Sequence, residues 1–184
     1  MLPWSVKTRS LMTRSSYLRI RMAEILNIPP EEFTLEEKYN ILVPQIKSLV
    51  EYENDLIANM SNVAAVLKSG FDHLWVGFYL VKDKELVLGP FQGPLACTRI
   101  SFGKGVCGKA WQDKSNLIVP DINSFPGHIA CGADSKSEIV IPGISKKKVI
   151  FVLDVDSAQI DSFCEIDRKY LEMIVKLLID YSDC

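Results

Sequence analysis

The 184-residue sequence contains no apolar stretch approaching the roughly 20 residues that cross a membrane, and it has no internal repeat. It also lacks a strong net charge. Its 21 basic and 23 acidic residues give −2 at pH 7, so neither a nucleic acid nor a membrane is expected as a partner. Hydrophobic residues make up 48% of the chain, which is enough to build the core of one domain.

Acidic residues are absent from the N-terminal end of the chain. Residues 1–22 carry a charge of +5 from the basic residues Lys7, Arg9, Arg14, Arg19 and Arg21. An acid-free, Ser/Thr-containing segment of this kind is typical of an organelle transit peptide, and it also fits a disordered tail. We therefore expect a basic extension over 1–22 and a folded domain over 23–184. The expected location is the cytoplasm, or the mitochondrion or another organelle if the extension is a transit peptide.

The sequence lacks the dense cysteine framework of small secreted proteins. It has an odd number of cysteines, five, and no secretory hydrophobic segment: Cys97, Cys107, Cys131, Cys164 and Cys184. Mostly reduced thiols are expected, and these bind metals, react or simply pack. His128 and Cys131 are one loose pair, whereas structural zinc sites offer two tight pairs, so we expect no metal site.

Three of the cysteines fit redox chemistry, although a single cysteine more often only packs in the core. Cys131 lies in a polar loop near His128, where a lowered thiol pKa is expected. Cys97 lies just after Gly93-Pro94 in an expected strand. Cys107 begins an expected helix, whose dipole favours the thiolate.

The hydrophobic pattern alternates between helix and strand periods. It predicts helices over 34–50, 54–68, 106–112 and 165–181, and strands over 74–81, 85–88, 96–102, 117–119, 138–141 and 148–154. Pro44 should kink or interrupt the first helix, and Gly89-Pro90 should begin a loop. Helices at both ends with strands between them predict an α+β domain, in which a mostly antiparallel central sheet is flanked by N- and C-terminal helices.

Residues 103–108 match the G-x-G-x-x-G pattern of dinucleotide-binding folds. Such a site also needs a longer helix and an acidic residue about 20 positions further on. Here the helix ends by Lys114, and Asp121 comes only 13 residues after Gly108. We therefore interpret these glycines as a tight turn between a strand and a helix.

Acidic and aromatic residues are spaced to meet on one side of the sheet. Asp154 and Asp156 are two apart in a strand and so share a face, as do Trp75 and Tyr79. Glu138 begins the preceding strand. Acids placed this way can bind a cationic amine, and one with a raised pKa can donate a proton. Taken singly, the acids also fit a solvated turn and the aromatic residues an ordinary core.

Six ordered segments together resemble one enzyme family. They are VGFYL at 76–80, LGPFQG at 88–93, GVCG at 105–108, FPGHIAC at 125–131, SEIV at 137–140 and LDVDS at 153–157. This set is similar to the free methionine-(R)-sulfoxide reductases, enzymes with a GAF domain. The resemblance covers about residues 34–178. It implies a single GAF-like domain that reduces free L-methionine-(R)-sulfoxide to L-methionine without a metal or organic cofactor.

The resemblance also implies a role for each matching cysteine. Cys131 corresponds to the nucleophile that attacks the sulfoxide sulfur and becomes a sulfenic acid. Cys97 corresponds to the main resolving cysteine, which forms an intramolecular disulfide, and Cys107 is a third cysteine that resolves in some members. The implied reductant is thioredoxin or a similar dithiol. The family also suggests a homodimer.

The matching acids and aromatic residues are implied to bind the substrate. Glu138, Asp154 and Asp156 correspond to the acids that hold the free amino acid and assist protonation of the oxygen. Trp75 and Tyr79 match residues that enclose the methyl-sulfinyl end. A free amino acid has a charged ammonium group, whereas the same nitrogen in a protein chain is a neutral amide.

Two positions depart from the family pattern. Gly132-Ala133 follow Cys131 where an acidic residue is usual, and Phe151 stands where a small residue is common. Neither change removes a residue to which a role is assigned. The alternative interpretation is a non-enzymatic GAF module that binds a small ligand or senses oxidants through Cys97 and Cys131.

Overall fold

The computed structural model describes residues 26–127 and 134–182. In chain order the elements are α2 (Leu35–Val50), α3 (Leu56–Gly70), β1 (Trp75–Lys82), β2 (Glu85–Gln92), β3 (Arg99–Ser101), α4 (Gly105–Asp113), β4 (Leu117–Val119), a 3-10 turn (Ile122–Ser124), β5 (Ser137–Ser145), β6 (Lys148–Ser157) and α5 (Glu165–Tyr181). The predicted extension over 1–22 lies outside the described residues. In the described part, no helix is both long and apolar enough to cross a membrane.

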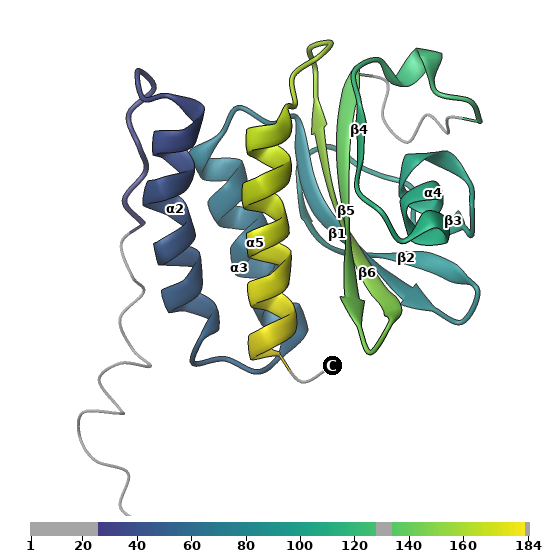
Figure 1. Cartoon of the computed structure of the whole chain (residues 1–184), viewed down its shortest axis with the longest axis horizontal. Helices are drawn as coiled ribbons and strands as arrows, with labels where there is room; N and C mark the ends of the chain where they lie inside the picture. The colour runs from purple at the N-terminus through teal and green to yellow at the C-terminus, as the bar shows by residue number, and fades with distance from the viewer. Residues whose placement is uncertain (1–25, 128–133, 183–184) are drawn as a thin grey trace, which may run out of the picture.

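The strands form one six-stranded sheet in the order β3-β2-β1-β6-β5-β4, and every neighbouring pair is antiparallel. Helices α3 and α5 pack on one face of the sheet, α2 packs against both on the side away from the sheet, and α4 lies on the other face (Figure 1). Each face carries its own buried apolar cluster. The predicted α+β architecture, an antiparallel sheet flanked by terminal helices, is confirmed.

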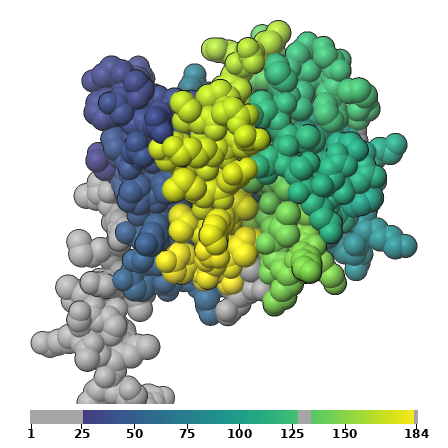
Figure 2. All heavy atoms as spheres, in the orientation of Figure 1, coloured from purple at the N-terminus to yellow at the C-terminus, as the bar shows by residue number. Residues whose placement is uncertain are grey.

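The helical face holds the larger apolar cluster. In α2 the helix begins with a capping box, in which the Thr34 hydroxyl accepts from the Glu37 amide and the Glu37 carboxylate accepts from the Thr34 amide. Tyr39 stacks on Tyr170 of α5, with 4.8 Å between ring centroids, and donates a hydrogen bond of 2.9 Å to the buried Asp167. Figure 2 shows α5 on the surface beside α2.

Some predicted boundaries differ from the structure. Helix α2 continues through Pro44 without a break. Pro44 and Asn40 are both exposed, so water can hydrate the Asn40 carbonyl that loses its intrahelical partner. Gly89-Pro90, predicted as a loop, lies inside β2, and β3 is shorter than the predicted strand. The two strands of the last hairpin, β5 and β6, are longer than predicted.

Candidate active site

The acids predicted to bind substrate meet on the sheet face that carries α4. Pairing of the strands sets Asp156 of β6 directly opposite Glu138 of β5 and, on its other side, opposite Trp75 of β1. Asp154 lies two residues before Asp156 and therefore on the same face. Its neighbours across the sheet are Val140 and Gly77. The adjacent strands β5 and β6 thus place three acids side by side, and β1 places Trp75 next to them.

These acids lie in surroundings that favour their neutral forms. Glu138 and Asp154 are each only 7% exposed, and Asp156 is partly exposed. Burial raises the pKa of Glu138 well above its usual range, and the nearby charges of Asp154 and Asp156 raise it further. The pKa of Asp154 is raised by burial and then by the charge of Asp156. Burial raises the pKa of Asp156 to about 6, against a hydrogen bond from Ser135 that lowers it.

Cys107 of α4 completes the buried cluster on this face. The side chain is 3% exposed, and its thiol donates to Oε1 of Glu138 at 3.7 Å. Burial raises the pKa of the Cys107 thiol well above its usual range, and the charge of Asp154 adds to that shift. The prediction that the helix dipole favours a Cys107 thiolate is therefore wrong. Loss of hydration and adjacent carboxylates outweigh the dipole, so the group is a neutral thiol.

An aromatic wall adjoins the acids. The Trp75 ring stacks on Tyr79 at 5.9 Å and on Phe91 of β2 at 5.5 Å between centroids. Both Trp75 and Tyr79 are buried, as the shared face predicted. Burial raises the pKa of Tyr79, and the charge of Asp154 is the second cause, which places the phenol beside the acids. Gly77 gives Trp75 its room, because a Cβ there would lie 2.3 Å from the indole ring.

Two buried polar atoms on this face have no hydrogen-bond partner among the described residues. They are Oδ1 of Asp154, an acceptor, and Nε1 of Trp75, a donor. Unpartnered buried polar groups are energetically costly and are rare outside functional sites. The cluster therefore has unused hydrogen-bonding capacity of both kinds. Cys107, Glu138 and Asp154 also present ligand atoms within 4.8 Å of one another, a spacing that can hold a metal ion.

The cysteines predicted to carry the redox chemistry are described only in part. Cys97 packs against the same apolar cluster as Trp75 and is disulfide-bonded. Cys107 and Cys164 are free thiols, the latter exposed. Cys131 lies outside the described residues. The described cysteines thus comprise one oxidised residue near the site, one buried thiol within it and one exposed thiol at the start of α5.

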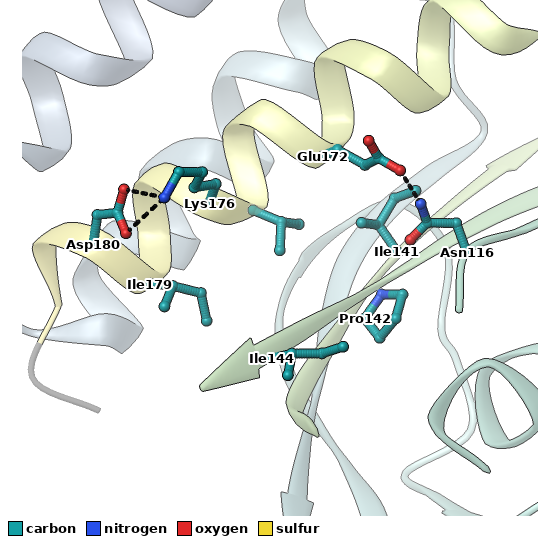
Figure 3. Close-up of a pocket in the computed structure, with 9 residues that line it drawn as sticks. Asn116, Ile141, Pro142, Ile144, Glu172, Lys176, Ile179 and Asp180 are labelled. Atoms are coloured by element: carbon teal, nitrogen blue, oxygen red, sulfur yellow. Dashed lines mark hydrogen bonds and ion pairs between the residues drawn. The ribbon is translucent and has the colours of Figure 1, made fainter. Parts of the chain in front are cut away.

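A separate cavity lies between β5 and α5. It has a volume of about 440 Å³ and is lined by Ile141, Pro142 and Ile144 of β5 and by residues of α5 including Glu172 and Lys176 (Figure 3). None of the predicted site residues that the structure describes lines it. The site is thus distinct from this groove between α5 and the sheet.

Two residues that contact the predicted substrate-binding residues were not predicted from the sequence. Phe91 extends the aromatic wall, and Ser135 donates a hydrogen bond to Asp156. Phe91 lies inside the LGPFQG segment, so the motif carried a signal for it. Nothing in the pattern around Ser135 indicates this hydrogen bond, because it depends on how the residues that lead into β5 lie beside β6.

A model of the GAF domain matches residues 53–178. "GAF domain-containing protein A" of Dictyostelium discoideum is 58% identical over 158 residues, which cover 85% of this chain and 99% of that protein. The free methionine-R-sulfoxide reductase of Saccharomyces cerevisiae is 40% identical over 78% of this chain and 84% of its own. This chain belongs to the GAF-domain family that contains the free methionine-R-sulfoxide reductases.

The structural comparison agrees with this family. The free methionine-R-sulfoxide reductase of Neisseria meningitidis, solved in complex with its substrate, superposes with a TM-score of 0.82. It is 46% identical and covers 85% of this chain and 95% of its own. The family predicted from six sequence segments is confirmed, and so is the GAF fold. The alignments cover 84% of the Saccharomyces cerevisiae enzyme and 95% of the Neisseria meningitidis enzyme, so the similarity spans nearly the whole length of these reductases.

Proposed function

We propose that this protein reduces free L-methionine-(R)-sulfoxide to L-methionine through cysteine chemistry. The observation that carries the proposal is the cluster of three acids on the adjacent strands β5 and β6, beside the aromatic wall of β1. Relatives named free methionine-R-sulfoxide reductase at 40% and 41% identity support the same enzyme class. The alternative, a module that binds a small ligand or senses oxidants through Cys97 and Cys131 without reducing sulfoxide, does not need selectivity for the R epimer.

The acids fit the ammonium end of a free amino acid. Asp156 with its pKa of about 6 is anionic at neutral pH, and the unpartnered Oδ1 of Asp154 can accept from an ammonium proton. Glu138 has a strongly raised pKa and is suited to keep a proton and to donate it. Trp75 and Tyr79 offer an apolar surface to the methyl-sulfinyl group. In this arrangement a peptide, whose nitrogen is a neutral amide, binds poorly.

The proposed reaction begins with attack of the Cys131 thiolate on the sulfoxide sulfur. A protonated acid of the cluster gives its proton to the sulfoxide oxygen, which makes that oxygen a better leaving group. The oxygen passes to Cys131 as a sulfenic acid, so the cysteine sulfur is oxidised by two electrons and methionine sulfur is reduced by two. The Cys97 thiol then condenses with the sulfenic acid, releasing water and forming a disulfide. Thioredoxin or a similar dithiol reduces that disulfide.

The described cysteines support Cys97 as the resolving residue. Cys97 is disulfide-bonded, whereas Cys107 is a buried neutral thiol that hydrogen-bonds Glu138. A thiol with a raised pKa is a slow nucleophile, which argues against Cys107 as the resolving residue of the main cycle. We also propose a homodimer and a cytoplasmic location, or an organellar one if residues 1–22 act as a transit peptide.

The deciding assay follows NADPH consumption with thioredoxin and thioredoxin reductase. Separated R and S epimers of free L-methionine sulfoxide are offered, together with the N-acetylated R epimer. We expect turnover of the free R epimer, with the S epimer and the N-acetyl compound at least about tenfold poorer, because the latter lacks the ammonium charge. Silence on all three substrates, with the thiols verified as reduced, would contradict the proposal.

Variants assign the two cysteines. Cys131→Ser should abolish turnover, and Cys97→Ser should allow one methionine per chain and then stop cycling. Cys164→Ser is the matched control, since Cys164 is an exposed free thiol at the start of α5, and it should cycle like the unchanged protein. Full activity of Cys131→Ser, or undiminished cycling of Cys97→Ser, would remove the role assigned to that residue.

A further inference from the structure

The cluster of Cys107, Glu138 and Asp154 has a composition that the reductase reaction does not explain. Amine binding needs only carboxylates, yet a thiol from α4 is buried against two of them. A sulfur ligand with two carboxylate oxygens is a donor set that suits Zn²⁺, whereas Mg²⁺ and Ca²⁺ prefer oxygen alone. The side chains come from three different elements, α4, β5 and β6, so the cluster is built by the tertiary fold.

We propose that Cys107, Glu138 and Asp154 bind a zinc ion, and that this ion inhibits the enzyme by occupying the place of the substrate ammonium. The inhibitory half of this inference rests on the proposed function. The ion is a regulator that competes with substrate, not a cofactor of the reaction. The site uses neither His128 nor Cys131, the loose pair considered from the sequence.

The distances fit tetrahedral coordination. With Zn–S of about 2.3 Å and Zn–O of about 2.0–2.2 Å, sulfur and oxygen ligands of one ion lie about 3.5–3.7 Å apart. The Cys107 Sγ to Glu138 Oε1 separation is 3.7 Å. The ligand atoms of all three residues lie within 4.8 Å of one another, so small side-chain rotations bring them to bonding distance. The fourth position remains for water.

Two further observations point to a cationic ligand. Oδ1 of Asp154 is buried without a hydrogen-bond partner, and a metal ion would satisfy it. The three ligands, when deprotonated, place three negative charges in a buried site with Asp156 alongside. A divalent cation neutralises two of these charges, and coordination deprotonates the thiol. Zinc therefore displaces protons from the cluster, and its affinity should rise with pH.

Calorimetric titration with ZnCl₂ tests the site without any need for activity. The titration uses the full chain with Cys97→Ser and Cys131→Ser, so that the disulfide and the nucleophile take no part. We expect one zinc per chain. Adding Cys107→Ser should weaken binding at least about tenfold, while adding Cys164→Ser, the exposed-thiol control, should leave it unchanged. Equal affinity with and without Cys107, or no binding at all, would overturn the proposal.

Two measurements guard against misfolding of the Cys107 variant. Asp154→Asn and Glu138→Gln, made in the same background and checked by circular dichroism, should each weaken zinc binding. With Co²⁺ as the probe, a thiolate-to-metal absorption band should appear with Cys107 and disappear in Cys107→Ser. A band that persists without Cys107 would place the metal on another thiol and contradict the assignment.

Inhibition is measured in a single turnover of prereduced enzyme, because thioredoxin binds zinc through its own thiols. Methionine formed should fall with added ZnCl₂, recover with EDTA, and be protected by excess sulfoxide. Zinc binding through Cys107 without loss of turnover would refute the inhibitory half. An enzyme with no turnover at all would refute the proposed function and leave the calorimetric test of the metal site standing.

Discussion

At the scale of single residues, the site concentrates acids that the fold keeps partly protonated. Burial raises the pKa of both Glu138 and Asp154, the charge of Asp154 raises that of Glu138 further, and Asp156 titrates near 6. A cluster of this kind can serve two tasks at neutral pH. An acid that has lost its proton attracts the substrate ammonium, and an acid that has kept its proton can donate it to the sulfoxide oxygen.

The pKa of Asp156 predicts how substrate binding depends on pH. Asp156 is anionic above pH about 6 and neutral below it, whereas the substrate ammonium stays charged throughout. In the inactive Cys131→Ser variant, the Kd for the free R sulfoxide should rise about tenfold between pH 7 and pH 5. Quenching of Trp75 fluorescence by the ligand provides the measurement.

Asp156→Asn should bind weakly at both pH values, with the step near pH 6 removed. Asp121→Asn is the control, because the Asp121 carboxylate accepts hydrogen bonds from Asn123 and Ser124, which lower its pKa, and within the described residues it forms no hydrogen bond with the acids of the cluster. That variant should keep the pH profile of the unchanged protein. A Kd that stays constant from pH 5 to pH 7.5 would argue against ammonium recognition by Asp156.

Some residue-level features were predictable from the sequence and others were not. Asp154 and Asp156 share a face because side chains alternate with a two-residue period along a strand. That period belongs to the strand itself and can be predicted without knowing which strands lie beside it. The state of Cys107 depends on Glu138 and Asp154, which come from other elements. Position in its own helix therefore gave the wrong sign for its pKa.

At the scale of elements, strand pairing decides which residues meet. The pairing of Glu138 with Asp156, and of Asp156 with Trp75, depends on the register of β5 with β6 and of β6 with β1. Turn residues and the alternation of apolar and polar residues locate the strands in a sequence, but they do not fix the register between neighbouring strands. The six family segments supplied that information, since they came with roles already assigned.

The register also explains how Phe151 replaces a small residue. Phe151 of β6 lies opposite Gly143 of β5, and its ring occupies the space where a Cβ of Gly143 would be, at 2.4 Å. The ring is fully buried and meets Phe78 edge-on at 5.8 Å. This contact is on the helical face of the sheet, away from the acids. The departure from the family pattern therefore alters packing and leaves the site unchanged.

Gly77 of β1 should be intolerant of a side chain. A Cβ there would lie 2.3 Å from the Trp75 ring and 2.5 Å from Cβ of Phe91, so the aromatic wall must shift. Gly77→Ala should destabilise the fold by about 1–3 kcal/mol and weaken substrate binding severalfold. Urea unfolding gives the first quantity, and titration with substrate in the Cys131→Ser background gives the second.

Gly143→Ala is the matched control for that prediction. It creates a clash of similar size, with Phe151, on the opposite face of the sheet. We expect a comparable loss of stability with little change in substrate affinity. Equal loss of affinity in both variants would mean that Gly77 acts only through overall stability and not through the position of Trp75.

At the scale of the whole molecule, one face of the sheet carries the main apolar core and the other carries the candidate site. The helical face carries the larger apolar cluster, including most of the fully buried residues of α2, α3 and α5. The other face places acids, a thiol and two unpartnered polar atoms under α4 and the adjoining loops. This division was predictable in outline, because helices at the two ends of the chain cover one face and leave the other to loops.

The acid cluster should therefore reduce stability at neutral pH. Asp156 has a pKa of about 6 in the folded protein and about 3.8 when unfolded, so between these values the folded state holds a proton that the unfolded state has lost. Its contribution to stability is present below pH about 4 and is lost as the pH rises through 6. Asp156→Asn removes this dependence while keeping an oxygen that accepts from Ser135.

Urea unfolding of Asp156→Asn and the unchanged protein at pH 4.5 and pH 7.5 measures the effect. We expect the variant to be more stable by about 1–3 kcal/mol at pH 7.5 and by about a third of that amount at pH 4.5, because only the charged form is disfavoured by burial. Asp121→Asn should have the opposite sign at pH 7.5, since the pKa of that exposed carboxylate is lowered in the fold. The buried His73, whose pKa of about 4 makes the fold less stable in acid, is present in every protein compared and cancels from the differences.

A variant less stable than the unchanged protein at pH 7.5 would mean that Asp156 is stabilised as an anion. In that case the charged Asp156 would stabilise the fold, and substrate binding would not have to offset a free-energy cost of burying its carboxylate.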